Sequence, residues 1–141
     1  MKSLISSVIA VIVFFGLTGC SQETNPFVGS WKLVSQKLIF SDTTITADAS
    51  TLQSMKILSQ THFAYVTDKT HQDSTIFLRA GAGTYTHSDK EYAEKIEYSS
   101  DPVMLGKTYR FSFEMEGDTW THIGDIEDYD VRIEEVWRRT Q

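Results

Sequence analysis

The sequence predicts an all-β protein, an antiparallel up-and-down barrel of about 8–10 strands. Short segments of alternating polar and apolar residues recur at ~8–12-residue spacing, and turn-forming residues separate them. No window carries a sustained helical stripe of apolar residues. The 115 residues from position 27 to position 141 suit eight strands of ~8 residues with loops of ~5. A closed barrel leaves no exposed sheet edge, which favours it over a sandwich.

Nine segments are expected to form strands, and two of them alternate most clearly. Tyr92 and Glu94 begin one series of alternate residues, and Tyr109 and Phe111 begin the other. Residues 47–54 could form one short turn. Gly81-Ala82-Gly83 is expected to form a bend, because glycine within strands marks bulges or barrel corners. The strand segments are 28–40, 52–58, 61–67, 74–78, 83–87, 90–98, 107–116, 119–124 and 131–138.

Composition excludes several classes of function. The chain has 13 Lys and Arg against 19 Asp and Glu, a net charge of −6, which argues against a nucleic-acid partner. A single cysteine forms no internal disulfide and no cysteine-based zinc site. The four histidines show no metal-ligand spacing. We therefore expect a monomer with no metal and no cofactor.

The first residues predict a targeting signal. Lys2 precedes the apolar run 8–15, which is too short for a transmembrane helix, so residues 1–19 are interpreted as a cleaved secretory signal peptide outside the fold. Leu17-Thr18-Gly19-Cys20 resembles the signal of bacterial lipoproteins. The resemblance implies cleavage before Cys20, a diacylglycerol on its sulfur and an acyl chain, such as palmitate, on its amine. A general signal peptide with a chance cysteine is the alternative.

The lipoprotein resemblance also implies a location and a domain order. Ser21 is not the aspartate that retains lipoproteins in the inner membrane of some bacteria, so the expected location is the outer membrane of a bacterial envelope. The expected partner is the lipid bilayer, reached through acylated Cys20. Residues 20–26 form a lipidated polar tether, and residues 27–141 form the barrel domain.

Motifs at both ends of this domain resemble those of lipocalins. Pro26-Phe27-Val28-Gly29-Ser30-Trp31 is similar to their first motif, and Trp137-Arg138-Arg139 is similar to their last strand. The spacing is closer to that of the lipocalin-like domains of small bacterial lipoproteins, and the middle Thr-Asp-Tyr motif of true lipocalins is missing. The resemblance implies that an arginine lies over Trp31 and closes the barrel. Since Trp137 and Arg139 share a strand face, Arg139 is the expected one.

Strand parity also predicts an aromatic cavity with one carboxylate and one imidazole. Residues two apart on a strand face the same side, so each strand brings a set of rings inward, although a bulge would reverse the assignment. The alternative is a barrel filled by these rings. The candidate ligand-binding residues are Tyr65, Tyr92, Glu94, Tyr98, Tyr109, Phe111, Phe113, Trp120 and His122.

Three functions follow from these observations. The leading hypothesis is a membrane-anchored envelope lipoprotein whose barrel binds a small apolar or aromatic ligand. The second is a small barrel enzyme that uses Glu94 or His122 as general acid or base. The third is a filled barrel that acts as a protein-interaction scaffold. No nucleophile–base pair is visible, so no residue is assigned as catalytic.

The anchor is tested by replacing Cys20 with Ser. The variant has no thiol to acylate, so we expect an unprocessed or freely soluble protein. Membrane fractionation with metabolic acyl labelling measures this. A processed, acylated variant in the membrane fraction would show that the lipoprotein interpretation is wrong.

Overall fold

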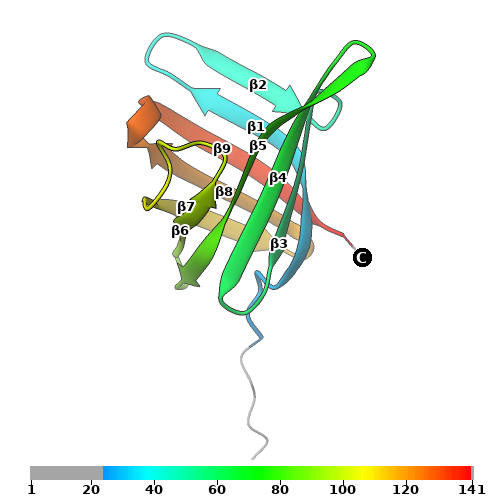
Figure 1. The fold of residues 1–141 in the computed structure, drawn as a ribbon. Helices are drawn as coiled ribbons and strands as arrows, with labels where there is room; N and C mark the ends of the chain where they lie inside the picture. Colours follow the sequence, from blue (N-terminus) through cyan, green and yellow to red (C-terminus); the bar gives the residue numbers. More distant parts are fainter. Residues whose placement is uncertain (1–23, 141) are drawn as a thin grey trace, which may run out of the picture.

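The computed structural model describes residues 24–140, which form nine β-strands (Figure 1). Eight of them correspond to the expected segments, and the ninth, residues 44–48, was not predicted. The predicted signal peptide, Cys20 and residues 21–23 of the tether lie outside the described residues. Across residues 24–140, no helix has the length and apolarity needed to span a membrane. The elements are β1 (Gly29–Ile39), β2 (Thr44–Asp48), β3 (Leu52–Leu58), β4 (His62–His71), β5 (Ser74–His87), β6 (Glu91–Ser99), β7 (Thr108–Glu116), β8 (Thr119–Ile126), the 3₁₀ turn η1 (Glu127–Tyr129) and β9 (Val131–Arg139).

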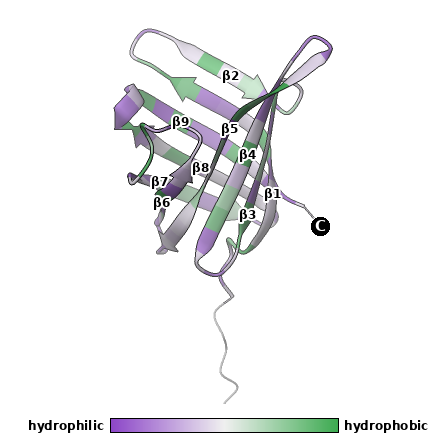
Figure 2. Cartoon of the chain, viewed as in Figure 1, coloured by the Kyte–Doolittle hydropathy of each residue, from purple (hydrophilic) through white to green (hydrophobic). Residues whose placement is uncertain are grey.

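Eight of these strands close into an antiparallel barrel, so the predicted fold class is confirmed. From β3 to β9 each strand pairs with the next one along the chain. β1 pairs with β9 through most of its length and with β3 at its beginning, which closes the cycle. β2 pairs only with the second half of β1 and forms a hairpin at one end of the barrel. Hydrophilic and hydrophobic residues interleave along the strands (Figure 2), as half-buried strands require.

Two local expectations hold only in part. Within residues 47–54 there is one short turn, at 49–51, where the Thr51 N–H donates to the Asp48 carbonyl at 3.0 Å, and the residues on either side belong to β2 and β3. Segments 74–78 and 83–87 are one long strand, β5, which continues through the glycine-containing stretch. A register irregularity between Ala82 and Gly83 in the pairing with β6 marks the expected bend.

Aromatic side chains fill the end of the barrel where β1 begins. Trp31 and Trp120 are fully buried with ring centroids 5.4 Å apart, and Tyr92 lies 4.9 Å from Trp120. Phe27, just before β1, packs against both of these rings, at 4.8 Å from Tyr92 and 5.1 Å from Trp120. The Trp31 indole N–H donates to the Phe27 carbonyl (2.9 Å), which fixes the incoming chain across this end. This end is therefore the closed end of the barrel.

Arg139 seals the closed end from outside. Its guanidinium carbon lies 4.2 Å from the centre of the Trp31 ring, and it donates to the carbonyl oxygens of Val28 (2.5 Å) and Pro26 (2.7 Å). Gly29 has φ +136°, and a Cβ there would lie 2.7 Å from Arg139 Nη1, so the contact requires glycine. Trp137 lies on the same strand face and is buried. The contact that the lipocalin resemblance implies is present, and it is made by Arg139, the arginine that strand parity selects.

The contribution of the closed end is measured by Trp31→Ala in a protein of residues 21–141. We expect this part to fold by itself, because the closed strand cycle and its core lie within residues 24–140. The variant should lose ~3–5 kcal/mol of unfolding free energy in urea, as buried large-to-Ala changes do. Tyr98→Ala, at a 72% exposed residue, is the control and should change stability by less than about 0.5 kcal/mol. A loss below about 1 kcal/mol for Trp31→Ala would contradict this account of the core.

Candidate functional site

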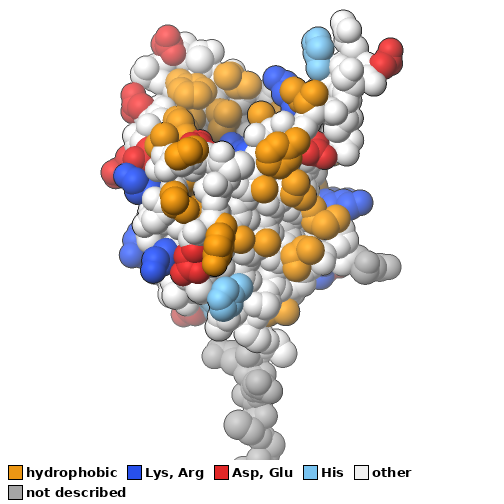
Figure 3. Space-filling model, viewed as in Figure 1, with side chains coloured by type: hydrophobic (Ala, Val, Ile, Leu, Met, Phe, Trp, Pro, Cys, Tyr) orange, Lys and Arg blue, Asp and Glu red, His pale blue; other side chains and the backbone are white. Residues whose placement is uncertain are grey.

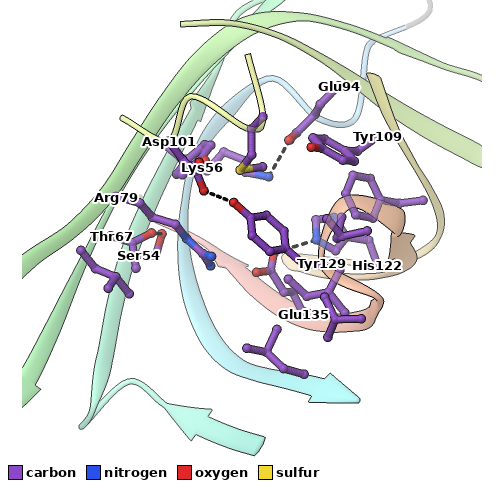
Figure 4. Close-up of a pocket in the computed structure, with 18 of the residues that line it drawn as sticks. Ser54, Lys56, Thr67, Arg79, Glu94, Asp101, Tyr109, His122, Tyr129 and Glu135 are labelled. Atoms are coloured by element: carbon purple, nitrogen blue, oxygen red, sulfur yellow. Dashed lines mark hydrogen bonds and ion pairs between the residues drawn. The ribbon is translucent and has the colours of Figure 1, made fainter. Parts of the chain in front are cut away.

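A cavity of about 430 Å³ occupies the opposite, open end of the barrel, where β1 ends (Figure 4). Hydrophobic side chains gather round this end of the surface, at the top of Figure 3. The lining residues come from eight of the nine strands, all except β2, from η1 and from the segments beside them. They are Leu38, Phe40, Ser54, Lys56, Tyr65, Thr67, Leu78, Arg79, Glu94, Asp101, Met104, Tyr109, Phe111, His122, Ile126, Tyr129, Val131, Ile133, Glu135 and Trp137.

One buried ion pair forms part of the cavity floor. Lys56 Nζ lies 2.6 Å from Glu94 Oε1, and both side chains are below 10% exposed (5% and 7%). Tyr92 donates its hydroxyl to the same Glu94 oxygen at 2.7 Å. The Lys56 ammonium also lies 5.0 Å from the ring centre of Trp137 and 5.3 Å from that of Trp120. Burial, and then the Glu94 charge, raise the pKa of Tyr92 well above its ordinary value, so its hydroxyl stays a donor.

A second buried pair completes the floor. His122 Nε2 lies 2.7 Å from Glu135 Oε2, and the Trp137 indole N–H donates to that oxygen at 3.0 Å. The Gln36 amide donates to the other Glu135 oxygen at 2.6 Å. Burial alone would raise the pKa of Glu135, but the hydrogen bond and charge of His122 and the charge of Lys56 lower it well below its usual range. Glu135 is therefore a buried carboxylate, not a neutral acid.

Polar contacts also hold the mouth of the cavity. Asp128 in η1 accepts from Lys107 at 2.9 Å and from the Tyr109 hydroxyl at 3.0 Å. The Tyr129 hydroxyl donates to Asp101 in the segment between β6 and β7. Deeper on the wall, burial raises the pKa of Tyr65 to about 12, so its phenol stays protonated at neutral pH. These contacts tie the segments around the opening to the barrel.

The structure brings most of the predicted cavity residues inside the barrel. Tyr92 and Trp120 are buried in the aromatic core under the floor. Phe113 points inward at the closed end, with its ring 4.9 Å from that of Phe27, and does not line the cavity. Those that line the cavity are Tyr65, Glu94, Tyr109, Phe111 and His122.

Tyr98 is the exception, and its predicted inward orientation is wrong. The side chain is 72% exposed. In the pairing of β6 with β5, Gly83 faces Ile96 but Ala82 faces Tyr98, so Glu97 is an extra residue on β6. This bulge turns Tyr98 outward after the buried Ile96. A Cβ at Gly83 would lie 1.9 Å from the Lys95 carbonyl oxygen, so the close approach of the two strands at the bulge requires glycine.

The residues that pair with Glu94 and His122 were not predicted from the sequence. Lys56 and Glu135, which pair with Glu94 and His122, were not among the candidates, and neither was Arg79 on the cavity wall. Glu135 could have been found, since it shares a strand face with Trp137. Lys56 could not, because its apolar neighbours Met55 and Ile57 made the wrong face of β3 look buried.

The site suits binding better than proton transfer. Glu94 and His122, the candidate acid and base, are both held in the buried pairs of the floor. Within residues 24–140, no three side chains of the metal-ligating types come together. The cavity itself has mostly apolar walls and a few fixed polar groups. This composition is typical of small-molecule binding sites.

These features define a closed antiparallel β-barrel domain with a cavity at one end, consistent with the lipocalin-like fold that the sequence motifs resemble. The family model described as "Domain of unknown function (DUF4488)" matches residues 26–141, which is most of the chain. The chain therefore belongs to the DUF4488 family. Comparison with curated proteins finds no match.

The ionised state of Glu135 is tested by the pH dependence of stability. Its folded pKa lies below the ordinary value of 4.5, so it stabilises the fold above that pH, and the stabilisation is lost as pH falls further. Glu135→Gln should destabilise the protein at about pH 7, and its difference from wild type should shrink towards about pH 3. Urea unfolding at several pH values measures this. A difference that stays constant with pH would contradict the buried carboxylate.

Proposed function

We propose that this protein is a membrane-anchored lipoprotein of the bacterial envelope whose barrel binds a small apolar or aromatic molecule. The observation that carries the binding role is the cavity of about 430 Å³ at one end of a barrel whose other end is packed solid. Small-molecule sites in proteins usually have volumes of about 300–1,000 Å³ and are lined mainly by apolar side chains, so this cavity falls within their range.

The wall formed by β7, β8 and β9 supports an apolar ligand. Phe111, Ile126, Val131 and Ile133 project into the space from these strands. Binding an apolar ligand to such a surface is favourable, because each Å² of apolar surface removed from water contributes roughly 25 cal/mol to the binding free energy. The buried pairs of the floor present fixed polar groups to the ligand at the inner end of the cavity. A filled scaffold barrel would need larger side chains at these positions.

The anchoring part of the proposal rests on the lipoprotein-like sequence around Cys20 and on the position of the chain start. Asn25 donates to the Tyr85 hydroxyl at 2.8 Å and Pro26 accepts from Arg139, so the chain enters the barrel at its closed end (Figure 1). An acylated Cys20 would therefore hold the barrel by the closed end and leave the open end facing away from its attachment point. Outer-membrane retention is part of the same proposal.

Binding is tested with the neutral fluorescent probe N-phenylnaphthylamine and residues 21–141. We expect saturable enhancement of its fluorescence, because the cavity offers an apolar site. Ile133→Trp should abolish it by filling the cavity from β9. Tyr98→Ala, on the outer surface, is the control and should leave binding unchanged.

Circular dichroism and urea unfolding establish that both variants keep the barrel. If the folded wild type does not bind the probe, or if Ile133→Trp binds as well as wild type, cavity binding is wrong.

A further inference from the structure

One cation on the cavity wall forms no ion pair with another side chain of the described residues. Two basic side chains line the cavity, and Lys56 is paired with Glu94. Arg79, on β5, is partly buried, yet it forms no ion pair with any other residue in the described part of the chain. The arginine side chain carries five N–H donors and a permanent charge. A partly buried arginine without a partner in the protein is free to bind an anionic group.

Two hydroxyls lie beside Arg79 on the same wall. Ser54 on β3 faces Thr67 on β4, and Thr67 faces Arg79 on β5, so the three form one row across three strands. Ser54 Oγ and Thr67 Oγ1 are 2.8 Å apart, and Thr67 is 2% exposed. Figure 4 shows all three on one side of the cavity, with the Arg79 side chain directed into it. The row places a guanidinium and hydroxyl groups along one strip of wall.

The carboxylates that face the same space already hold their own donors. Glu94 accepts from Lys56 and Tyr92, and Glu135 accepts from His122, Trp137 and Gln36. Asp101 at the mouth accepts from Tyr129. Arg79 is therefore the lining charge that an incoming ligand can neutralise. A guanidinium matches a carboxylate with two parallel hydrogen bonds, which makes the pairing stronger and more directional than a neutral contact.

We propose that Arg79, with Thr67 beside it, is the subsite for the anionic group of an amphipathic ligand. The ligand class is an organic monoanion, an apolar chain or ring system that ends in a carboxylate, with its apolar part against Phe111 and Ile133 on the wall formed by β7, β8 and β9. This inference rests on the proposed binding function and makes its ligand class specific.

The test compares dodecanoate with dodecanol, which share a chain and differ in the charged end. Each ligand displaces N-phenylnaphthylamine from residues 21–141 at about 150 mM salt, where long-range charge effects are screened. Wild type should bind dodecanoate at least about ten-fold more tightly than dodecanol, the size of one charge-assisted contact. Arg79→Gln should lose this preference while its affinity for dodecanol stays within about two-fold.

Two further variants isolate the role of Arg79. Arg110→Gln removes the same charge from an exposed arginine paired with Glu91 on the outer face, and it should keep the full preference. Arg79→Lys keeps the charge without the planar fork, and it should keep a reduced preference. It also provides the test if Arg79→Gln does not fold.

The outcomes separate the two proposals. If neither the probe nor dodecanol binds wild type, cavity binding fails and the subsite fails with it. If both bind but dodecanoate has no advantage, the anion subsite is wrong while cavity binding stands. The subsite is also overturned if the advantage survives in Arg79→Gln, or if Arg110→Gln loses as much of it.

Discussion

The pairing of β1 with β9 is the constraint on which the rest of the structure depends. It joins the first and last strands and turns a linear series of hairpins into a closed cycle. β1 also spans both ends of the barrel, with Trp31 in the packed end and Leu38 at the cavity. An irregularity between Leu33 and Ser35 leaves Val34 without a partner, so that Gln36 turns inward after the buried Leu33. The bulge thus supplies the amide that binds Glu135.

The buried pairs divide the interior into a packed half and an open half. Below them, large rings such as Trp31, Tyr92 and Trp120 meet in contact. Above them, small side chains such as Ser54 and Thr67 leave open space. In the packed half, aromatic rings occupy the corresponding space. An eight-stranded barrel is just wide enough for side chains to fill it or for one small ligand to enter. Side-chain size in each layer therefore decides where the barrel is solid and where it is open.

The sequence predicts the barrel and much of the site where hydropathy and strand parity agree. β7 is the clearest example, because Tyr109 and Phe111 alternate with polar residues and both face the cavity. β3 is the opposite case: its inner face carries Lys56, and its outer face carries the exposed Met55 and Ile57. Hydropathy alone selects the wrong face there, since the ion pair that stabilises Lys56 inside comes from a distant strand.

The bulge at Glu97 marks a different limit, because it changes parity within a strand. No local sequence feature distinguishes Tyr98, which faces outward, from Tyr92 and Glu94, which face inward. Tyr98 faces outward because of the bulge that forms where Gly83 on the neighbouring strand approaches β6 closely. Pairing partners are a property of the assembled sheet, so single-strand patterns cannot locate such a shift.

The interior is layered from the open end to the closed end, and the layers differ in how their charges are balanced. The Ser54–Thr67–Arg79 row lies one inward layer nearer the mouth than Lys56 and Tyr65. In the deeper layer, the Lys56 charge meets Glu94 inside the protein, because a buried charge without a partner is costly. Arg79 keeps partial contact with solvent, which lowers the cost of leaving it unpaired. A charged side chain at the boundary between water and an apolar cavity is stabilised most by a ligand that carries both an opposite charge and an apolar surface.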